Sequence, residues 1–374
     1  MAASRTSKTL SPIIITGGCG FVGSHLVEAL LKEDASYEIH VIDIHTERNR
    51  FPGVTYHSCD IASPNEVDAV FSEAKPRTVF HTACPDFLVL NPSRFQSVNV
   101  GGTQNLLVSA KKINTVQAFI YTSSSSVIHD NISNLIDADD TLPVLQYPAQ
   151  KRVYTLTKAR AEAEVLAANR ENDSSMLTAS IRPVTAFGER DFGCMGKIVA
   201  QCRAGRGNVQ IGSGDNLYDF TYITNLADAH ILAAHALVEA HGKAPLPPEM
   251  RVDGETFIIT NDEPMLFWEF QRAVAASVDL PIRREQIRVI PRWLAMLVAT
   301  LTEWATWIGS FGTKQASITR EAIHLTTITR TLKCDKAKRI LGYNPRISID
   351  EGLQRAGKWF IDEARKTQDA KKRT

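Results

Sequence analysis

The chain has 374 residues, 44% of them hydrophobic and 22% charged, values typical of a globular protein with a sizeable core. Its formal net charge of +1 offers no general attraction to a polyanion, so nucleic acid is not expected as a partner. The six cysteines are scattered without a C-x-x-C pair, and no histidine stands at ligand spacing, so we expect reduced thiols and no metal site. The first twelve residues contain no apolar run suited to a secretory signal or an anchor.

The first predicted strand, Ile13–Thr16, leads into a glycine-rich turn and then into a helical stretch, Ser24–Leu31. The glycines fit both G-x-G-x-x-G and the wider G-x-x-G-x-x-G spacing. Glycine is needed where a turn takes backbone angles that a Cβ opposes, and where a pyrophosphate approaches the main chain and a helix N-terminus. We therefore predict a dinucleotide site made by Gly17, Gly20, Phe21, Val22 and Gly23.

A second apolar strand, residues 38–43, closes with Asp43, twenty residues beyond the last glycine of the turn. A carboxylate there can accept hydrogen bonds from both adenosine ribose hydroxyls and repels a 2′-phosphate, which favours NAD over NADP. The alternative is an ordinary turn residue at a strand end. Asp60 and Ile61 follow a third strand, Val54–His57, and are expected to contact the adenine.

Two further strands are predicted at residues 78–82 and 118–121, and the second ends in a run of four serines. Such a run is usually a solvated turn. At the carboxyl edge of a strand in a doubly wound sheet, however, it faces the ligand crevice. We choose Ser124 to hold a substrate oxygen, with Ser123 and Ser125 as alternatives.

Tyr154 and Lys158 stand four residues apart in a helix-favouring segment, so their side chains share one helix face. A phenol is a poor base at neutral pH, but a nearby ammonium favours the phenolate. Tyr154 is therefore a candidate acid/base, and Lys158 is predicted to lower its pKa. Chance spacing in an ordinary helix is the alternative.

Strands and helices alternate up to a sixth predicted strand, Leu177–Arg182. This alternation predicts an α/β fold of the Rossmann type, with a doubly wound parallel sheet. We expect residues 1–185 to form an NAD-binding domain. Residues 186–374 are expected to form mainly a smaller C-terminal substrate-binding lobe, with segments that return to the core.

The most apolar stretch, residues 291–309, holds Trp293, Trp304 and Trp307. One glutamate and a limited length argue against a membrane span. Tryptophan prefers the headgroup boundary, so we expect a helix that lies in a membrane surface, and a helix buried against the second lobe is the alternative. The tail Lys371–Thr374 has the dilysine spacing of an endoplasmic-reticulum retrieval signal, which a solvated basic tail explains as well.

The glycine turn, Asp43, the serine run, the tyrosine–lysine pair and Ile181-Arg-Pro183 together resemble the extended short-chain dehydrogenase/reductase superfamily. Longer stretches narrow the resemblance to its 3β-hydroxysteroid dehydrogenase branch, and within that branch to the fungal sterol-4α-carboxylate 3-dehydrogenases. These stretches are Arg50–His57, Tyr121–His129, Asp219–Asn225, Phe257–Pro264 and Lys336–Gly342.

The resemblance implies NAD-dependent oxidation of the 3β-hydroxyl of a sterol or related terpenoid, with loss of a C4 carboxylate as carbon dioxide when one is present. Ser124, Tyr154 and Lys158 would be catalytic, and Lys158 would also bind the nicotinamide ribose. Further cofactor contacts implied by the resemblance are Thr82, Ala83, Asn99, Pro183 and Val184.

The same resemblance implies an enzyme held peripherally on the cytosolic face of the endoplasmic-reticulum membrane, near partner enzymes of C4 demethylation. A homodimer is also expected. A cytoplasmic location is the alternative.

Several positions around the expected pocket depart from the family pattern while the cofactor residues do not. Cys84 stands where the family usually has serine, Ser125 replaces a usual alanine, and Val184-Thr-Ala-Phe-Gly188 is unusual. A paralogue that oxidises a triterpenoid or meroterpenoid without decarboxylation is therefore the first alternative. A nucleotide-sugar epimerase, which shares Tyr-x-x-x-Lys, and a non-catalytic dinucleotide-sensing regulator are less favoured.

Overall fold

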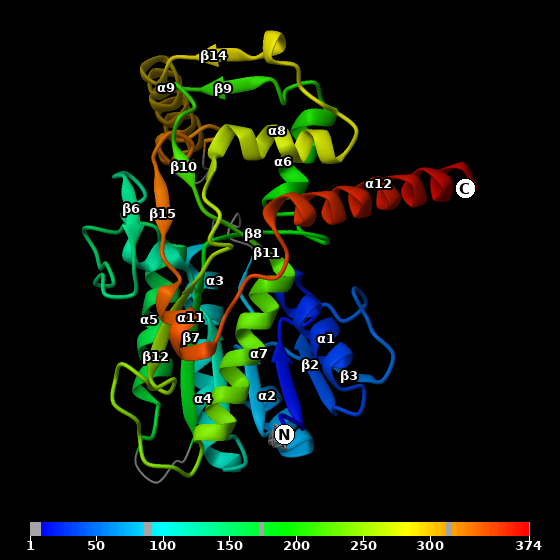
Figure 1. Cartoon of the computed structure of the whole chain (residues 1–374), viewed down its shortest axis with the longest axis vertical. Helices are drawn as coiled ribbons and strands as arrows, with labels where there is room; N and C mark the ends of the chain where they lie inside the picture. Colours follow the sequence, from blue (N-terminus) through cyan, green and yellow to red (C-terminus); the bar gives the residue numbers. More distant parts are fainter. Residues whose placement is uncertain (1–8, 86–90, 172–175, 312–315, 374) are drawn as a thin grey trace, which may run out of the picture.

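A seven-stranded parallel sheet forms the larger part of the computed structural model, which describes residues 9–85, 91–171, 176–311 and 316–373 (Figure 1). Its strand order is β12-β7-β5-β4-β1-β2-β3. The order reverses between β1 and β4, the point at which doubly wound sheets bind ligands. The strands are β1 (Ile13–Thr16), β2 (Ile39–Asp43), β3 (Val54–Ser58), β4 (Thr78–His81), β5 (Ala118–Thr122), β7 (Leu177–Pro183) and β12 (Glu255–Ile259). The predicted fold class is confirmed.

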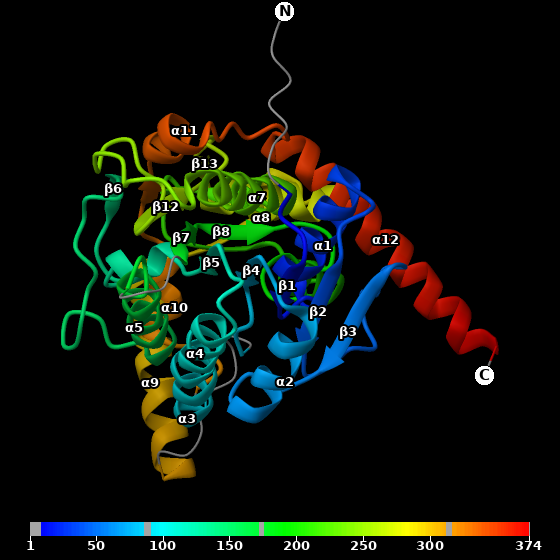
Figure 2. The same cartoon turned by 90° about the horizontal axis from the view of Figure 1, so that it is seen from below.

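Helices cover both faces of this sheet, so its central strands are buried on both sides. In β1, Ile13 and Ile15 pack into one core and Ile14 into the other, because successive side chains of a strand point to opposite faces. Figure 2 shows the two helical layers on either side of the sheet. The first contains α1 (Phe21–Glu33) and α7 (Ile223–Ala240), and the second contains α2 (Pro64–Ala74), α4 (Thr103–Ile113) and α5 (Val153–Ala167).

Segments cross the predicted boundary at residue 185 in both directions. From the second half of the chain, β12 pairs with β7 and α7 packs on β5 and β7. From the first half, β6 (Leu135–Ala138) joins a separate sheet of order β13-β10-β15-β6, where it pairs with β15 (Arg330–Leu332). The return of β12 and α7 to the core agrees with the expected returning segments, while the division into 1–185 and 186–374 stays a prediction.

The remaining elements lie mostly beyond the carboxyl ends of the main strands, in the upper half of Figure 1. Helix α12 runs from beside α8 out to the C-terminus. The strands are β8 (Thr185–Phe187), β9 (Val209–Ile211), β10 (Leu217–Tyr218), β11 (Phe220–Tyr222), β13 (Met265–Leu266) and β14 (Arg288–Ile290). The helices are α3 (Pro92–Phe95), η1 (Gln96–Gly102), η2 (Ser125–Ile128), α6 (Met195–Arg203), α8 (Phe267–Ser277), η3 (Arg284–Gln286), α9 (Arg292–Ser310), α10 (Arg320–Leu325), α11 (Asp335–Leu341) and α12 (Ile349–Arg373).

The tryptophan-rich stretch forms α9, and most of its apolar surface is exposed. Only Ala295 and Ala299 are buried in this helix, while Trp293, Trp304 and Trp307 are 69%, 59% and 60% exposed. Helix α9 packs on its lobe through Ala295, Ala299 and the partly buried Met296, and most of its other apolar side chains are exposed. The alternative of a helix buried in the second lobe is therefore wrong. Among the described helices, none combines the length and apolar character that crossing a bilayer requires. The dilysine tail lies outside the residues whose side chains are described.

Candidate active site

The glycine turn folds so tightly against β4 and its own backbone that side chains are excluded. Gly17 has φ +69°, and a Cβ there would lie 2.8 Å from the Ala83 Cα. A Cβ on Gly23 would lie 2.3 Å from the Gly17 carbonyl oxygen. Helix α1 starts at Phe21, behind Gly20, with no side-chain cap and no acidic residue in its first turn. Its first N–H groups can therefore bind an anion, which is the chemistry a pyrophosphate needs.

Asp43 ends β2 beside this turn. Its Oδ2 accepts from the Cys19 N–H at 3.1 Å and its Oδ1 from the His45 N–H at 3.0 Å. Each carboxylate oxygen has a further lone pair, so the fixed carboxylate can accept from ribose hydroxyls as well. Next along the edge, Asp60 accepts from the Ala62 N–H at 2.9 Å.

The other predicted cofactor contacts lie at the same carboxyl edge of the sheet. Thr82 donates from Oγ1 to the Thr16 carbonyl at 2.7 Å, which ties the end of β4 to the end of β1. Ile61 is buried against Gly102, where a Cβ would lie 2.6 Å from the isoleucine side chain. At the end of β7, Pro183 is followed by Val184, whose N–H donates to the Ile259 carbonyl at 3.1 Å. Their roles stay predictions.

The serine run and the start of α5 meet next to this edge. Ser124 caps η2, accepting from the Ser126 N–H at 3.2 Å, and Tyr154 is the second residue of α5. A hydrogen bond joins the Tyr154 phenol and the Ser124 side chain. The Ser123 hydroxyl is buried without a partner in the described chain, and Ser125 accepts from Arg330. The geometry therefore favours Ser124 among the three serines considered.

Burial, a hydrogen bond and several charges act on the pKa of Tyr154. Burial raises the pKa of the phenol, while the hydrogen bond with Ser124 and the charges of Arg152 and Arg330 lower it. The Arg152 guanidinium lies 5.5 Å from the centre of the tyrosine ring. The lowering of this pKa by Lys158 stays a prediction.

Lys158 is buried one helical turn beyond the tyrosine and points toward β5. Its Nζ donates to the Thr122 carbonyl and lies 4.4 Å from the centre of the Tyr121 ring. Burial lowers the pKa of this ammonium. The proposed action of Lys158 on Tyr154 is therefore not visible as a contact in this structure, because the Lys158 side chain is directed at the strand end.

Asn99 lies in a π-helical segment, η1, between α3 and α4. Its Nδ2 donates to Thr157 Oγ1 at 3.0 Å, so the amide faces the helix that carries the tyrosine and the lysine. Its Oδ1 is buried and has no partner among the described residues. Local π-helix often occurs at functional sites. The position agrees with a supporting role for Asn99.

Three residues near Tyr154 were not singled out from the sequence for a role here. Cys84 raises the pKa of the phenol through its charge, whereas Arg152 and Arg330 lower it. Arg152 directly precedes α5, so its place beside the tyrosine could have been read from local sequence. Arg330 lies in β15, 205 residues from its partner Ser125, and no spacing in the sequence predicts that contact.

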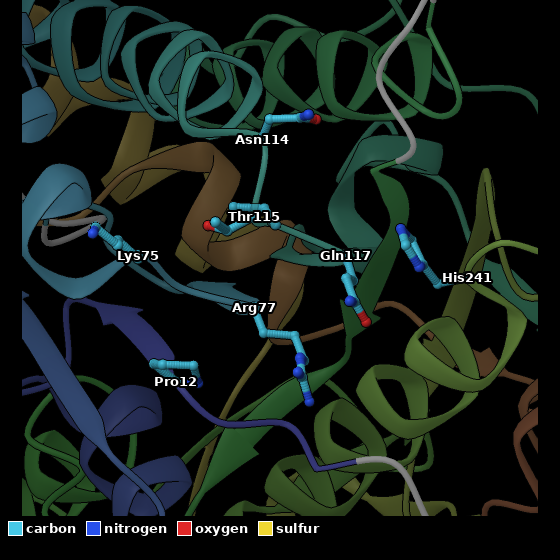
Figure 3. A pocket seen from close by; sticks show the side chains of 8 residues that line it. Pro12, Lys75, Arg77, Asn114, Thr115, Gln117 and His241 are labelled. Carbon is cyan, nitrogen blue, oxygen red and sulfur yellow. The ribbon is translucent and has the colours of Figure 1, made fainter.

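Two other features lie away from this edge. A cavity of about 320 Å³ opens at the amino ends of β4 and β5, lined by Lys75, Arg77 and His241 among others (Figure 3). His40 and His57 hydrogen-bond to each other at 2.9 Å. Together with Glu73 they form a group whose possible metal-ligand atoms lie within 4.8 Å of one another. No spacing in the sequence predicts this group. Neither adjoins the serine run.

Solved structures share this architecture. The chain aligns with UDP-glucose 4-epimerase of Thermotoga maritima at a TM-score of 0.70 and 20% identity, covering 94% of this chain and 99% of that one. It aligns with the Thermus thermophilus enzyme, solved with NAD, at 0.68 and 20%, covering 93% and 98%. At these identities the likeness concerns the fold alone. This is a protein of the Rossmann-fold class to which NAD-dependent epimerases and dehydrogenases belong.

Sequence relatives narrow the class. The family model described as the 3-beta hydroxysteroid dehydrogenase/isomerase family matches residues 14–290. The decarboxylating sterol-4-alpha-carboxylate 3-dehydrogenase of Saccharomyces cerevisiae is 33% identical, covering 94% of this chain and 98% of the relative. The 3beta-hydroxysteroid-dehydrogenase/decarboxylase isoform 1 of Arabidopsis thaliana is 36% identical, covering 91% and 78%. The chain belongs to this family of oxidoreductases, which confirms the predicted resemblance.

Proposed function

We propose that this enzyme oxidises the 3β-hydroxyl of a sterol or related terpenoid to the 3-ketone and releases a C4 carboxylate as carbon dioxide when one is present. The observation that carries the proposal is that family relatives from yeast, plant and mouse are named for this reaction. The contact between Ser124 and Tyr154 at the carboxyl edge supports it, because alcohol oxidation needs a proton acceptor beside an oxygen-binding group.

The cofactor in this proposal is NAD. The turn would hold the pyrophosphate, since Gly17 and Gly23 leave no room for a Cβ and the start of α1 is uncapped. Asp43 would accept from the adenosine ribose and disfavour a 2′-phosphate. When bound, the nicotinamide supplies the hydride acceptor.

Tyr154 is the proposed acid/base. Its phenolate accepts the proton of the C3 hydroxyl as the carbinol hydrogen leaves as hydride, and Ser124 donates to the substrate oxygen. Lys158 would bind the ribose next to the nicotinamide. Asn99, with its free Oδ1, could order a water or hydroxyl between the helix and the crevice.

Decarboxylation needs no further residue in this scheme. Oxidation at C3 turns a C4 carboxylate into a β-keto acid, in which the bond between C4 and the carboxyl carbon can break with its electrons passing into the C3 carbonyl. Carbon dioxide leaves, and the resulting enolate oxygen lies where Ser124 and the protonated Tyr154 donate. Reprotonation at C4 then gives the 3-ketone.

A substrate comparison tests the proposal. The purified protein is supplied with NAD and a 4α-carboxysterol, the matching 4α-methylsterol, a 3-hydroxy-triterpenoid or UDP-glucose, and NADH absorbance and product mass are followed. We expect NADH with the carboxysterol and a product that has lost hydrogen and carbon dioxide. Oxidation without loss of carbon dioxide would favour the triterpenoid or meroterpenoid alternative, and turnover of UDP-glucose alone would contradict the proposal.

We further propose that α9 lies in the surface of a lipid bilayer, so that the enzyme is peripheral to the endoplasmic-reticulum membrane. Its exposed tryptophans are suited to the headgroup region of a bilayer, where tryptophan rings prefer to lie. An insoluble sterol dissolved in the same bilayer would then lie close to the enzyme. Four exposed arginines around its start add attraction to anionic headgroups. They are Arg283, Arg284, Arg288 and Arg292.

A further inference from the structure

The described chain contains two buried arginines, and they are neutralised in different ways. Arg182, 4% exposed, donates from Nε and Nη2 to both oxygens of the Glu162 carboxylate. Arg330, 7% exposed, forms no ion pair within the described residues. A buried charge is costly unless it is paired, so Arg330 calls for a negative partner that the described residues do not provide.

The unpaired edge of Arg330 is the one that Arg182 uses for its carboxylate. Arg330 Nε is buried without any hydrogen-bond partner among the described residues. Its Nη2 donates one proton to Ser125 Oγ at 2.9 Å and has a second to give, and its Nη1 donates to Tyr218 Oη at 3.2 Å. Nε and Nη2 together form the side-on fork that matches a carboxylate.

The charge of Arg330 acts on the carboxyl group of Asp219, but the two side chains do not form an ion pair. Burial raises the pKa of Asp219 to about 6, and the charge of Arg330 lowers it. The carboxylate instead accepts the Leu332 N–H at 2.7 Å through Oδ2. Arg152, the other cation beside Tyr154, is already paired with Glu321 at 3.7 Å. Of these two arginines, Arg330 is thus the one with spare donors.

The position of Arg330 relates it to the reacting carbon. Ser125, which holds its Nη2, directly follows Ser124, and Ser124 hydrogen-bonds Tyr154. The charge of Arg330 also lowers the pKa of the Tyr154 phenol, so the guanidinium acts on the group that would hold the substrate hydroxyl. On a 4-carboxysterol, the carbon next to the carbinol bears the negative charge.

On this basis, and resting on the proposed function, we infer that Arg330 binds the C4 carboxylate of the substrate side-on through Nε and Nη2, with Ser125 orienting the guanidinium. Arg330 is then a specificity-determining residue that selects carboxylated over uncharged sterols. Once carbon dioxide has left, the same cation lies near the enolate oxygen that takes up the charge.

The test compares two matched sterols, a 4α-carboxysterol and the 4α-methylsterol with the same ring system, on the full-length protein. In Arg330→Met, we expect kcat/KM for the carboxysterol to fall about 30-fold or more, with a much smaller fall for the methylsterol. Arg330→Lys should recover part of the preference, since it retains the charge without the fork. Arg272→Met, which removes a partly buried arginine that is paired with Glu269, is the control and should keep the wild-type ratio.

A milder variant covers the case in which Arg330→Met does not fold. Ser125→Ala leaves the charge in place and should lower the carboxysterol preference by roughly 3- to 10-fold, because the hydrogen bond that orients the guanidinium is lost. Equal losses for both sterols in Arg330→Met or, if that variant is unfolded, an unchanged ratio in Ser125→Ala would overturn the inference. If the wild type oxidises neither sterol, the proposed function fails. Tryptophan-fluorescence titration with the carboxysterol then decides separately, since equal affinity in wild type and variants would exclude Arg330 as its ligand.

Discussion

The proposed cofactor side of the site and its proposed substrate side are built in different ways. On the cofactor side, one strand, one turn and one helix within residues 13–33 form the proposed pyrophosphate site, and Asp43 at the end of the next strand is the proposed acceptor for the ribose. On the substrate side, Ser125 and Arg330 meet across 205 residues of sequence, and the exposed α9 belongs to a separate lobe. The first is a local backbone geometry, whereas the second exists only when distant segments pack together.

The largest expected effect is at Tyr154, where the two sides meet. Tyr154→Phe removes the proton acceptor while retaining the ring, so kcat should fall by about 10²- to 10⁴-fold. NADH affinity, measured by fluorescence titration, should stay within about twofold, since the cofactor side is intact. Tyr147→Phe, at a tyrosine 73% exposed, is the matched control. Full turnover in Tyr154→Phe would remove this residue from the mechanism.

A substitution on the cofactor side should have the opposite signature. Gly23→Ala places a Cβ 2.3 Å from a backbone oxygen, so the turn must open. We expect NADH affinity to fall about tenfold or more and the free energy of unfolding to fall by about 1–3 kcal/mol. Gly309→Ala, in α9, has no atom within 4 Å of the new Cβ and should leave both unchanged or slightly raise stability. Unchanged NADH affinity in Gly23→Ala would exclude the turn as the cofactor site.

The substrate-side lobe can be separated from the crevice through its exposed helix. Replacing Leu301, Trp304 and Trp307 together by glutamine removes three side chains that are about 60% exposed. Flotation with anionic vesicles should fall about tenfold or more, because each apolar side chain that is buried in the bilayer contributes roughly 1.5–3 kcal/mol to the free energy of membrane binding. Val108→Gln, at an exposed valine on α4, is the control and should float like the parent. Equal flotation of the triple variant would contradict the membrane proposal.

The smallest expected effect is on stability at low pH and concerns His230, a buried residue of α7 that contacts the end of β5. His230 Nδ1 donates to the Leu226 carbonyl at 2.8 Å and its Nε2 accepts from Thr122 Oγ1 at 2.7 Å, so the ring is satisfied when neutral. Burial lowers its pKa from 6.5 to about 4. The unfolded chain binds the proton more readily, so this contribution to stability is complete above pH 6.5 and is lost as the pH falls toward 4.

The variant His230→Gln should therefore show a weaker dependence on pH. Between pH 7 and pH 5, its loss of unfolding free energy should be smaller than that of wild type by about 1–2 kcal/mol, as followed by urea titration. His45→Gln, at an exposed histidine, should retain the wild-type slope. An identical slope in His230→Gln would mean that the ring does not stay neutral in the folded protein.

Several elements could be predicted from the sequence because their signals are local. A β-branched run predicts the strand Ile13–Thr16, and the glycines after it predict a tight turn that excludes side chains. The acid at the end of β2 lies at the spacing expected for a ribose contact. The apolar stretch 291–309 also forms the expected helix, as α9. Periodicity predicts that a segment is helical, but it does not give the surface on which the helix packs, and α7 is buried while α9 is exposed.

The amino-acid sequence by itself determined the Rossmann-type sheet and the family, and it predicted the glycine turn as the cofactor site and Ser124, Tyr154 and Lys158 as the catalytic set, because these depend on short spacings along the chain. Only the tertiary structure decided that β12 joins the main sheet, that Lys158 faces the end of β5, and that Arg330 lies beside Ser125 with an unpaired edge. Those features depend on strand pairing and burial between segments far apart, and no local pattern encodes them.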